Sequence, residues 1–148
     1  MMAISTRGRY SLRILILLAS QPDGRILTKQ GIAETEAVPL AYVQQLMIPL
    51  RAAGFVSSYR GKVGGFALAQ TAETITVADV LRATEGPIAL APCFGNRSCE
   101  REPRCPTRPL WSRAAELLDD FFSGVTVAAL AERRASSSSI REGTPHAE

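Results

Sequence analysis

Hydrophobic residues in the first third of the chain recur at the spacing of three helices. Residues 6–20 carry an apolar face of helical period, and Thr28 is a candidate cap for a short second helix that ends near Glu36. A third helix is expected to begin at Pro39 and to stop before Gly54. Its apolar stripe consists of Leu40, Val43, Leu46, Met47 and Leu50.

The pattern changes after Gly54. Residues 55–59 suit a short strand, "RGKVGG" suits a hairpin tip, and "FALA" suits the returning strand. Two helices joined by a tight turn and followed by a hairpin are typical of a winged helix-turn-helix domain, whose second helix enters the major groove of DNA. Arg60 and Lys62 at the hairpin tip would then reach the neighbouring phosphates. The alternative is an ordinary small α+β core with a solvated loop.

The second half of the chain contains further helices. Thr76 and Asp79 form an approximate capping box for a helix that ends at Gly86, and residues 108–124 form an amphipathic helix. We predict a mainly α fold with a small β-hairpin wing: a winged helix-turn-helix domain followed by a long C-terminal dimerisation helix. The expected parts are a DNA-binding domain at 1–85, a cysteine-containing cluster-binding loop at 86–108, a dimerisation helix region at 109–134 and a disordered tail at 135–148.

The helix at 108–124 is more apolar than the outside of a small domain needs. Its large apolar residues include Leu110, Trp111, Leu117, Leu118, Phe121 and Phe122. They either pack within the core or pair with the same helix of a second chain. A homodimer suits a DNA-binding module of this kind, because one recognition helix contacts too few base pairs for useful affinity.

Composition and charge add a candidate partner. Hydrophobic residues make up 46% of the 148 residues, but no apolar run of about 18 exists, so we expect no contact with a membrane and a cytoplasmic location. Residues 1–66 carry eight Lys or Arg against three acids, whereas residues 67–148 carry nine against eleven. A basic first half suggests that it contacts a polyanion, although a merely basic, soluble surface would look the same.

The three cysteines of the chain lie within thirteen residues. Cys93, Cys99 and Cys105 are separated by five residues each, a spacing that does not suit the paired cysteines of a zinc site. A long loop with three thiolates suits an iron–sulfur cluster that leaves one iron position for another ligand. Nearby arginines would favour thiolates and offset the negative charge of the cluster. The alternative is that the three are incidental reduced cysteines.

Nothing in the sequence points to an enzyme. No nucleophile and base are arranged around a structured histidine, and "GKVGG" lies in the hairpin and lacks the phosphate-binding pattern. A small iron–sulfur carrier or redox protein is the remaining non-regulatory interpretation, and it would leave the basic first half unexplained.

Taken together, "STRGRYSLRIL", "LAYVQQLMIPLRAAGFVSSYRGKVGGFALA" and the C-x5-C-x5-C-P-T-R-P-L-W motif resemble the IscR/NsrR/RirA-type winged helix-turn-helix regulators of the Rrf-two family over residues 2–133. The resemblance implies a homodimeric bacterial regulator that binds double-stranded promoter DNA. It implies that each subunit holds an iron–sulfur cluster, two-iron or four-iron, through Cys93, Cys99 and Cys105. The state of the cluster would control promoter binding in response to iron, cluster status, oxygen or nitric oxide. A cluster-free member that senses thiol oxidation is the alternative.

The chain departs from that family at the fourth cluster ligand. The IscR-like branch has a histidine where Arg108 stands, and the NsrR-like branch has an acid in the first helix, where this chain has Gly8. The single histidine is His146, in the tail. Glu100 and Glu102 are candidate ligands on the loop, beside water, a small thiol or a group from the partner subunit.

The resemblance also assigns roles to the DNA-binding half. The predicted contacts to base edges come from Tyr42, Gln44 and Gln45, where Gln44 replaces an acid that is common in the IscR-like branch. The predicted phosphate contacts come from Thr28, Arg51, Arg60 and Lys62.

Overall fold

The computed structural model describes residues 4–62, 64–94 and 99–142 of the chain. Six α-helices and a two-stranded antiparallel sheet occur in these ranges. The elements are α1 (Thr6–Ala19), α2 (Lys29–Glu36), α3 (Leu40–Ala52), β1 (Val56–Tyr59), β2 (Gly65–Leu68), α4 (Val77–Glu85), α5 (Arg108–Ser123) and α6 (Val127–Glu142). Short 3-10 helices at Pro22–Gly24, Ala72–Thr74, Pro92–Phe94 and Glu102–Arg104 lie between them.

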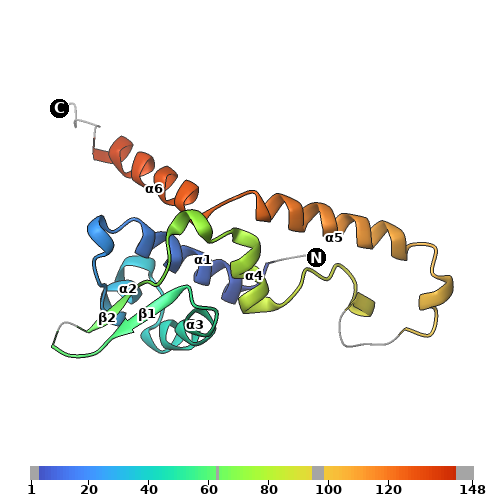
Figure 1. Ribbon diagram of the computed structural model, residues 1–148, viewed down its shortest axis with the longest axis horizontal. Helices are drawn as coiled ribbons and strands as arrows, with labels where there is room; N and C mark the ends of the chain where they lie inside the picture. Colours follow the sequence, from blue (N-terminus) through green and yellow to red (C-terminus); the bar gives the residue numbers. More distant parts are fainter. Residues whose placement is uncertain (1–3, 63, 95–98, 143–148) are drawn as a thin grey trace, which may run out of the picture.

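Helix α1 is the centre of a helical body made of α1–α4, the wing and α6. Helices α2, α3, α4 and α6 all contact α1 (Figure 1). The side chains that fill the space between them are Ile14, Leu15, Ile32, Leu46, Leu50, Ile75 and Val80, all almost completely buried. Burying one such side chain stabilises the fold by about 1.5–3 kcal/mol, so the body has a core of its own.

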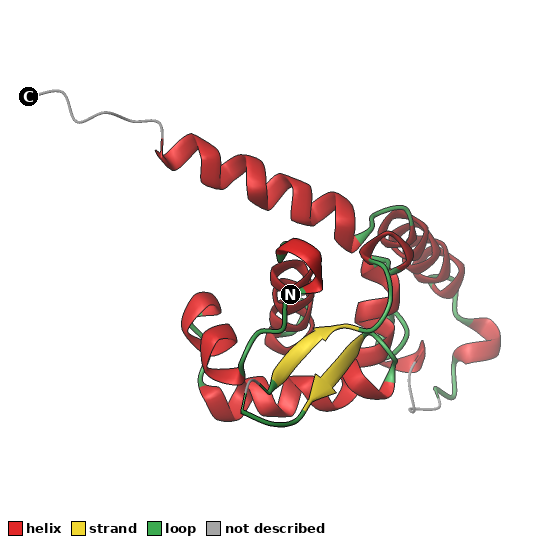
Figure 2. Cartoon of the chain, turned by 60° about the vertical axis from the view of Figure 1, so that its left-hand side comes forward, coloured by secondary structure: helices red, strands yellow, loops and turns green. Residues whose placement is uncertain are grey.

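The wing is fastened to the segment that leads into α2. Strand β1 pairs with β2 from Val56↔Leu68 to Tyr59↔Gly65, and Leu27 and Phe66 exchange two backbone hydrogen bonds of 2.9 and 2.8 Å. Gly65 is required there, because a Cβ would collide with the carbonyl of Leu27. Figure 2 shows the resulting ribbon at the edge of the helical body.

The cysteine arm, residues 87–124, projects from this body (Figure 1). It consists of the cysteine loop and the returning helix α5. At its base, Arg82 of α4 forms ion pairs with Asp79 on its own helix and with Asp119 on α5. No side chain of α5 is fully buried.

The predicted fold class is confirmed. The capping box is present as expected: Thr76 Oγ1 accepts a hydrogen bond from the Asp79 N–H, and the Asp79 carboxylate accepts one from the Thr76 N–H. The predicted division into four parts stays a prediction, and residues 143–148, with His146, lie outside the described residues.

The last helix is longer than the sequence indicated. The dimerisation helix region was expected to end at residue 134 and to be followed by a disordered tail at 135–148, but α6 runs from Val127 to Glu142. Val127 is fully buried, its N–H donates to the Ile75 carbonyl at 2.9 Å, and Thr126 caps the helix by accepting from the Ala129 N–H. Because this first turn is fixed by packing, the unfavourable nucleation step is already overcome, and each further residue adds one hydrogen bond, even in a serine-rich segment.

Candidate DNA interface and cysteine loop

The turn between α2 and α3 contains no glycine, although one of its residues adopts a left-handed backbone conformation. Ala37 adopts a left-handed conformation with φ 52°, a geometry that costs an L-residue about 1–2 kcal/mol. Buried Val38 follows it and donates its N–H to the Ala33 carbonyl at 3.0 Å. At the other end of α2, Thr28 Oγ1 accepts from the Gly31 N–H at 3.0 Å. Together these contacts fix the angle at which α3 leaves the body.

Helix α3 has one buried face and one exposed face. The buried face consists of Val43, Leu46, Met47 and Leu50. The exposed face consists of Leu40, Ala41, Gln44, Gln45, Ile48, Arg51 and Ala52. Three of the predicted DNA contacts, Gln44, Gln45 and Arg51, therefore share the surface that points away from the core.

Tyr42 lies at the border between these two faces. It is half-buried and packs edge-on against Tyr10 with ring centroids 6.1 Å apart. The guanidinium of Arg13 lies 5.0 Å from the centroid of the Tyr10 ring. Packing against α1 is thus the role of Tyr42 that the structure displays, and its contact to a base stays a prediction.

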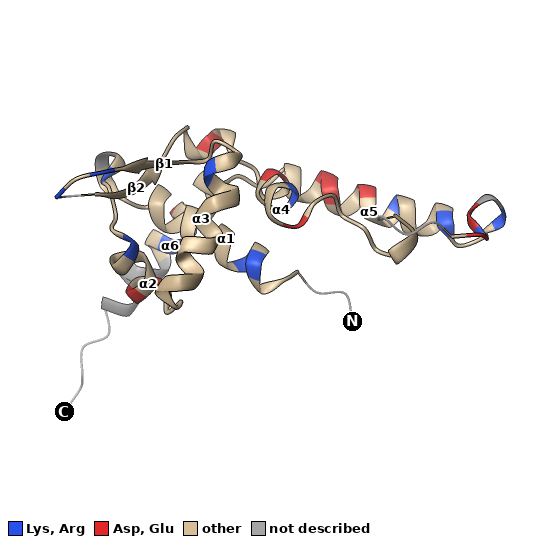
Figure 3. Ribbon diagram, turned by 90° about the horizontal axis from the view of Figure 1, so that it is seen from below, with Lys and Arg blue, Asp and Glu red and all other residues tan. Residues whose placement is uncertain are grey.

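Two open hollows flank the wing. The first, of about 480 Å³, brings Thr28 at the start of α2 together with Leu40 of α3 and Arg60 of the wing. The second, of about 520 Å³, lies on the other side of β1 and is lined by Ile48, Arg51 and Ser57, among others. Lys62 is exposed at the wing tip, and Figure 3 shows basic residues at the wing and on α3. The exposed α3 face therefore lies beside a wing that carries Arg60 and Lys62, and Arg51 is the one basic side chain on the face itself.

The cysteine loop holds three reduced, half-buried thiols. Cys93 lies in the 3-10 helix Pro92–Phe94, and Cys105 directly follows the one at Glu102–Arg104. Within residues 4–62, 64–94 and 99–142, no group of three His, Cys, Asp or Glu side chains is gathered closely enough to hold a metal ion. The thiols are thus placed on one loop but are not brought together around a point.

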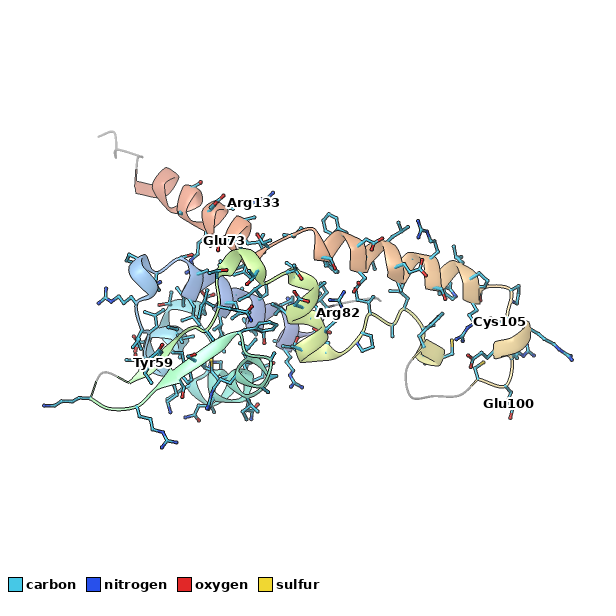
Figure 4. All side chains as sticks on the ribbon, viewed as in Figure 1. Tyr59, Glu73, Arg82, Glu100, Cys105 and Arg133 are labelled. Carbon is cyan, nitrogen blue, oxygen red and sulfur yellow. The ribbon has the colours of Figure 1, made fainter. Side chains whose placement is uncertain are left out.

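Arg108 joins the two ends of this loop. It forms a 2.7 Å ion pair with Glu102, and its guanidinium lies 4.9 Å from the centroid of the Phe94 ring, next to Cys93. Its Nη1 atom is buried and has no hydrogen-bond partner. A buried guanidinium N–H without an acceptor is costly, and an anion on the loop would satisfy it. Glu102 is thus already paired, whereas Glu100 is exposed on the far side of the loop (Figure 4).

Cys105 has an environment that favours its thiolate. Its Sγ lies 3.3 Å from Thr107 Oγ1, and this hydrogen bond, with help from the Thr107 backbone and from Arg108, holds the pKa of the Cys105 thiol below its ordinary value. Thiolates are both the metal-binding and the oxidisable form of cysteine. The geometry therefore suits either chemistry at this position.

The N-cap residue of α1, Ser5, is bound by a carboxylate from α4, a contact that the sequence did not indicate. Glu85 accepts hydrogen bonds from the Ser5 N–H at 3.2 Å and from the Ser5 hydroxyl at 2.9 Å. A Cβ at Gly8 would collide with this carboxylate, so Glu85 occupies the space that a side chain at Gly8 would take. The 80-residue separation of the two partners leaves no signal in a single sequence.

Helix α5 leaves apolar side chains in solvent. Leu110 is 60% exposed, Leu117 53% and Phe121 65%. With Ala114 they follow one another at intervals of four, three and four residues, the spacing of a helix–helix seam. Leu118 and Phe122, on another side of α5, line a hollow of about 600 Å³ together with Ile4 and Leu81.

Comparison with known proteins places the whole chain among regulators. Residues 4–133 match the Rrf2 family model, described as an iron-dependent transcriptional regulator. The HTH-type transcriptional regulator IscR of Erwinia tasmaniensis is 31% identical over 87% of this chain and 78% of its own. The structure of CymR, the global cysteine regulator of B. subtilis, is 34% identical, covers 90% of this chain and 98% of its own, and superimposes with a TM-score of 0.74. T. potens IscR shares the fold, with a TM-score of 0.72, 23% identity, and coverage of 99% of this chain and 94% of its own.

Proposed function

Because this chain belongs to the Rrf2 family of DNA-binding transcriptional regulators, we propose that it acts as a homodimer whose binding to promoter DNA is controlled by the cysteine arm. The relatives are regulators and not enzymes, as the sequence indicated. Within the described ranges, no helix has the length and apolar character needed to cross a bilayer.

The observation that carries the proposed DNA contact is the exposed face of α3 beside a basic wing. Gln44 and Gln45 would contact base edges, Arg51 would contact a phosphate, and Arg60 with Lys62 would place the wing on the adjacent backbone. Thr28 lines the same hollow as Arg60, so a phosphate seated there would meet both.

A salt titration tests this surface. We would measure the affinity of the protein for duplexes enriched from a random library, at several salt concentrations, for the wild type, Arg60→Ala and Lys62→Ala. Each substitution should weaken binding and lower the salt slope by about 1.8, because each subunit of the homodimer loses one phosphate contact and each contact contributes about 0.9. Arg113→Ala is the matched control, since Arg113 lies on α5 and pairs with Glu116. Unchanged slopes in both wing variants would remove the wing from the DNA contact.

The proposed dimer uses the exposed seam of α5. A second copy would cover the Leu110, Leu117 and Phe121 side chains, which otherwise expose large apolar area. A dimer would also present two α3 helices, one for each of the two half-sites of a DNA site. The cysteine loop ends at the residue where this helix begins, so a change in the loop acts directly on the dimer contact.

The donor set on the loop fits an iron–sulfur cluster. Cys93, Cys99 and Cys105 would supply three thiolates, and the buried Nη1 of Arg108 would donate to the anionic cluster. When bound, the cluster supplies a redox- and iron-sensitive group. Holding it requires the three thiols to converge, which would move the loop relative to α5.

Three carboxylates are candidates for the fourth ligand. Glu100 is exposed, and ligation by Glu102 would require its ion pair with Arg108 to open. Glu85 joins them, because its carboxylate fills the space at Gly8, where the resemblance to the NsrR-like branch puts an acid. Comparing Glu85→Gln, Glu100→Gln and Glu102→Gln by the visible spectrum of the reconstituted protein tests each; the true ligand is the one whose loss changes the bands.

Anaerobic reconstitution with iron and sulfide tests the cluster itself. The wild type should bind stoichiometric iron and sulfide, and Cys93→Ser, Cys99→Ser or Cys105→Ser should retain little of either while far-ultraviolet circular dichroism stays unchanged. Failure of the wild type to take up iron and sulfide would contradict the cluster.

A thiol sensor without a cluster is the second candidate. Two observations favour it: the lowered pKa of Cys105 and the similarity to a protein described as a global cysteine regulator. In that case the reconstituted protein would show no charge-transfer bands, and oxidant treatment alone would change its affinity for DNA.

A further inference from the structure

The exposed face of α3 has a specific chemical composition. Over its first three turns it presents Leu40, Ala41, Gln44, Gln45 and Ile48, and its first charged residue is Arg51 near the C-terminus. The face therefore offers amides and apolar groups where the helix would lie deepest in a groove.

Ile48 is the unusual member of this face. It is 69% exposed, although an isoleucine of the neighbouring helix α2, Ile32, is fully buried. Ile48 lines the hollow beside β1 together with Arg51 and Ser57, so it lies within the proposed DNA-contacting surface and not on the dimer seam of α5. Burial of this side chain against an apolar group of the DNA would be favourable.

Among the base pairs, A·T presents the major-groove edge that best complements glutamine amides together with an apolar side chain. A glutamine amide can donate to N7 and accept from the N6 amine of adenine, and the C5-methyl of thymine is the apolar group in the groove. Guanine is usually contacted by Arg or Lys and cytosine by a carboxylate, and this face has neither before Arg51. Resting on the proposed function, we propose that α3 selects A·T base pairs, with Gln44 and Gln45 contacting adenine and Ile48 contacting a thymine methyl.

The first part of the experiment identifies the bases. Selection of tight-binding duplexes from a random library with the intact protein should enrich A·T pairs at the positions that α3 covers in each half-site. If no duplex is enriched, the proposed function fails and the inference fails with it. If duplexes are enriched but G·C pairs dominate at these positions, regulation by DNA binding stands and the assignment to A·T is wrong.

The second part isolates the Ile48 contact. Replacing one thymine by deoxyuridine removes only the methyl group, and at the contacted position it should weaken wild-type binding about 3- to 5-fold. The same replacement should have no effect on Ile48→Ala, because the contact is already lost. Deoxyuridine outside the half-sites is the control. A loss that persists unchanged in Ile48→Ala, or no loss at any half-site thymine, would overturn the contact.

The third part tests the glutamines in the same way. Replacing a half-site adenine by 7-deazaadenine removes the N7 acceptor and should weaken wild-type binding by about 5-fold or more. Gln44→Ala or Gln45→Ala should abolish this sensitivity at one adenine position each. Both side chains are exposed, so the folding of these variants, checked by thermal unfolding, should be unchanged. Sensitivity retained in both variants would show that other residues contact adenine.

Discussion

The helical body and the cysteine arm differ in how completely they bury their apolar side chains. The body buries Ile14, Leu15 and Leu50 completely, whereas α5 in the arm buries no side chain completely and exposes four large apolar ones. The body thus has a packed core of its own, whereas the arm would be completed by the second copy in the proposed dimer. This difference suits the proposed regulation, because the part proposed to respond to a signal is the part with the least packing of its own.

The two regions are joined at a well-ordered point. The Val77 N–H donates to the Val125 carbonyl, and the Val127 N–H donates to the Ile75 carbonyl, both at 2.9 Å. Beyond it, Arg134 of α6 donates to Glu36, the last residue of α2, at 2.7 Å. A displacement of α5 at this junction would therefore be transmitted to the packed body. It would also be transmitted through α6 to α2, the helix that precedes α3.

The largest expected effect is on the body. Leu50→Ala removes a fully buried side chain and should lower the free energy of unfolding by about 2–5 kcal/mol, measured by urea denaturation. The same measurement on Leu110→Ala, in the arm, should show a change of about 0.5 kcal/mol or less in protein dilute enough to be monomeric. Equal losses in the two variants would erase the distinction between the regions.

A substitution in the exposed seam of α5 should instead weaken the association of two chains. Leu117→Asp places a charge in the α5 seam and should raise the dimer dissociation constant at least about tenfold, because burying an unpaired carboxylate is unfavourable. Sedimentation equilibrium measures this, and circular dichroism should show the body unchanged. Asp120→Asn, a conservative change elsewhere on α5, is the control. A Leu117→Asp protein that dimerises like the wild type would place the dimer contact elsewhere.

A smaller effect is expected at the contact between α2 and α6. Glu36 is only 3% exposed and accepts hydrogen bonds from both Arg13 and Arg134. Glu36→Ala should lower the free energy of unfolding by about 1–3 kcal/mol. The loss is limited because both arginines are partly exposed, so water can replace some of the hydrogen bonds that they make to Glu36. Glu34→Ala, on the exposed side of α2, should change it little. Similar values for the two variants would argue against a role for Glu36 in joining α2 to α6.

The smallest effect is on the Cys105 thiol. Thr107→Val removes the hydroxyl that lowers the pKa of Cys105, so the pKa should rise, and cluster-free protein should react more slowly with iodoacetamide at neutral pH. The pH at which the reaction reaches half its maximal rate should shift upward, measured with Cys93 and Cys99 replaced by serine. Thr107→Ser keeps a hydroxyl and should behave as the wild type. An unchanged profile in Thr107→Val would mean that the hydroxyl does not act on the thiol.

Local patterns were enough to predict most of the body. The caps Thr28 and Thr76 and the apolar stripe of α3 depend on neighbours within a few residues, and they lie where the sequence placed them. The exception is Leu40, which was predicted in the stripe but is 40% exposed at the start of α3. The extension of α6 was missed because it depends on the packing of Val127 against residues far away in the chain.

The site was less predictable, for a similar reason. The predicted apolar stripe of α3 left out Ile48 and no role was assigned to it, whereas the structure places it on the exposed face with Gln44. The ion pair between Glu36 and Arg134 and the hydrogen bonds between Glu85 and Ser5 join residues 98 and 80 positions apart, which no local pattern reveals. In the proposed cluster-bound form, convergence of the three thiols would depend on the bound group, so the polypeptide alone would not determine it.

The most direct test of the account compares one affinity in two states. Fluorescence anisotropy on an enriched duplex, at fixed salt and without oxygen, should give dissociation constants for cluster-loaded and cluster-free protein that differ by about 5- to 150-fold, the range of typical coupling between two sites. The Cys99→Ser protein should bind like the cluster-free form. Equal affinity in both states of the wild type would contradict control of DNA binding by the cysteine arm.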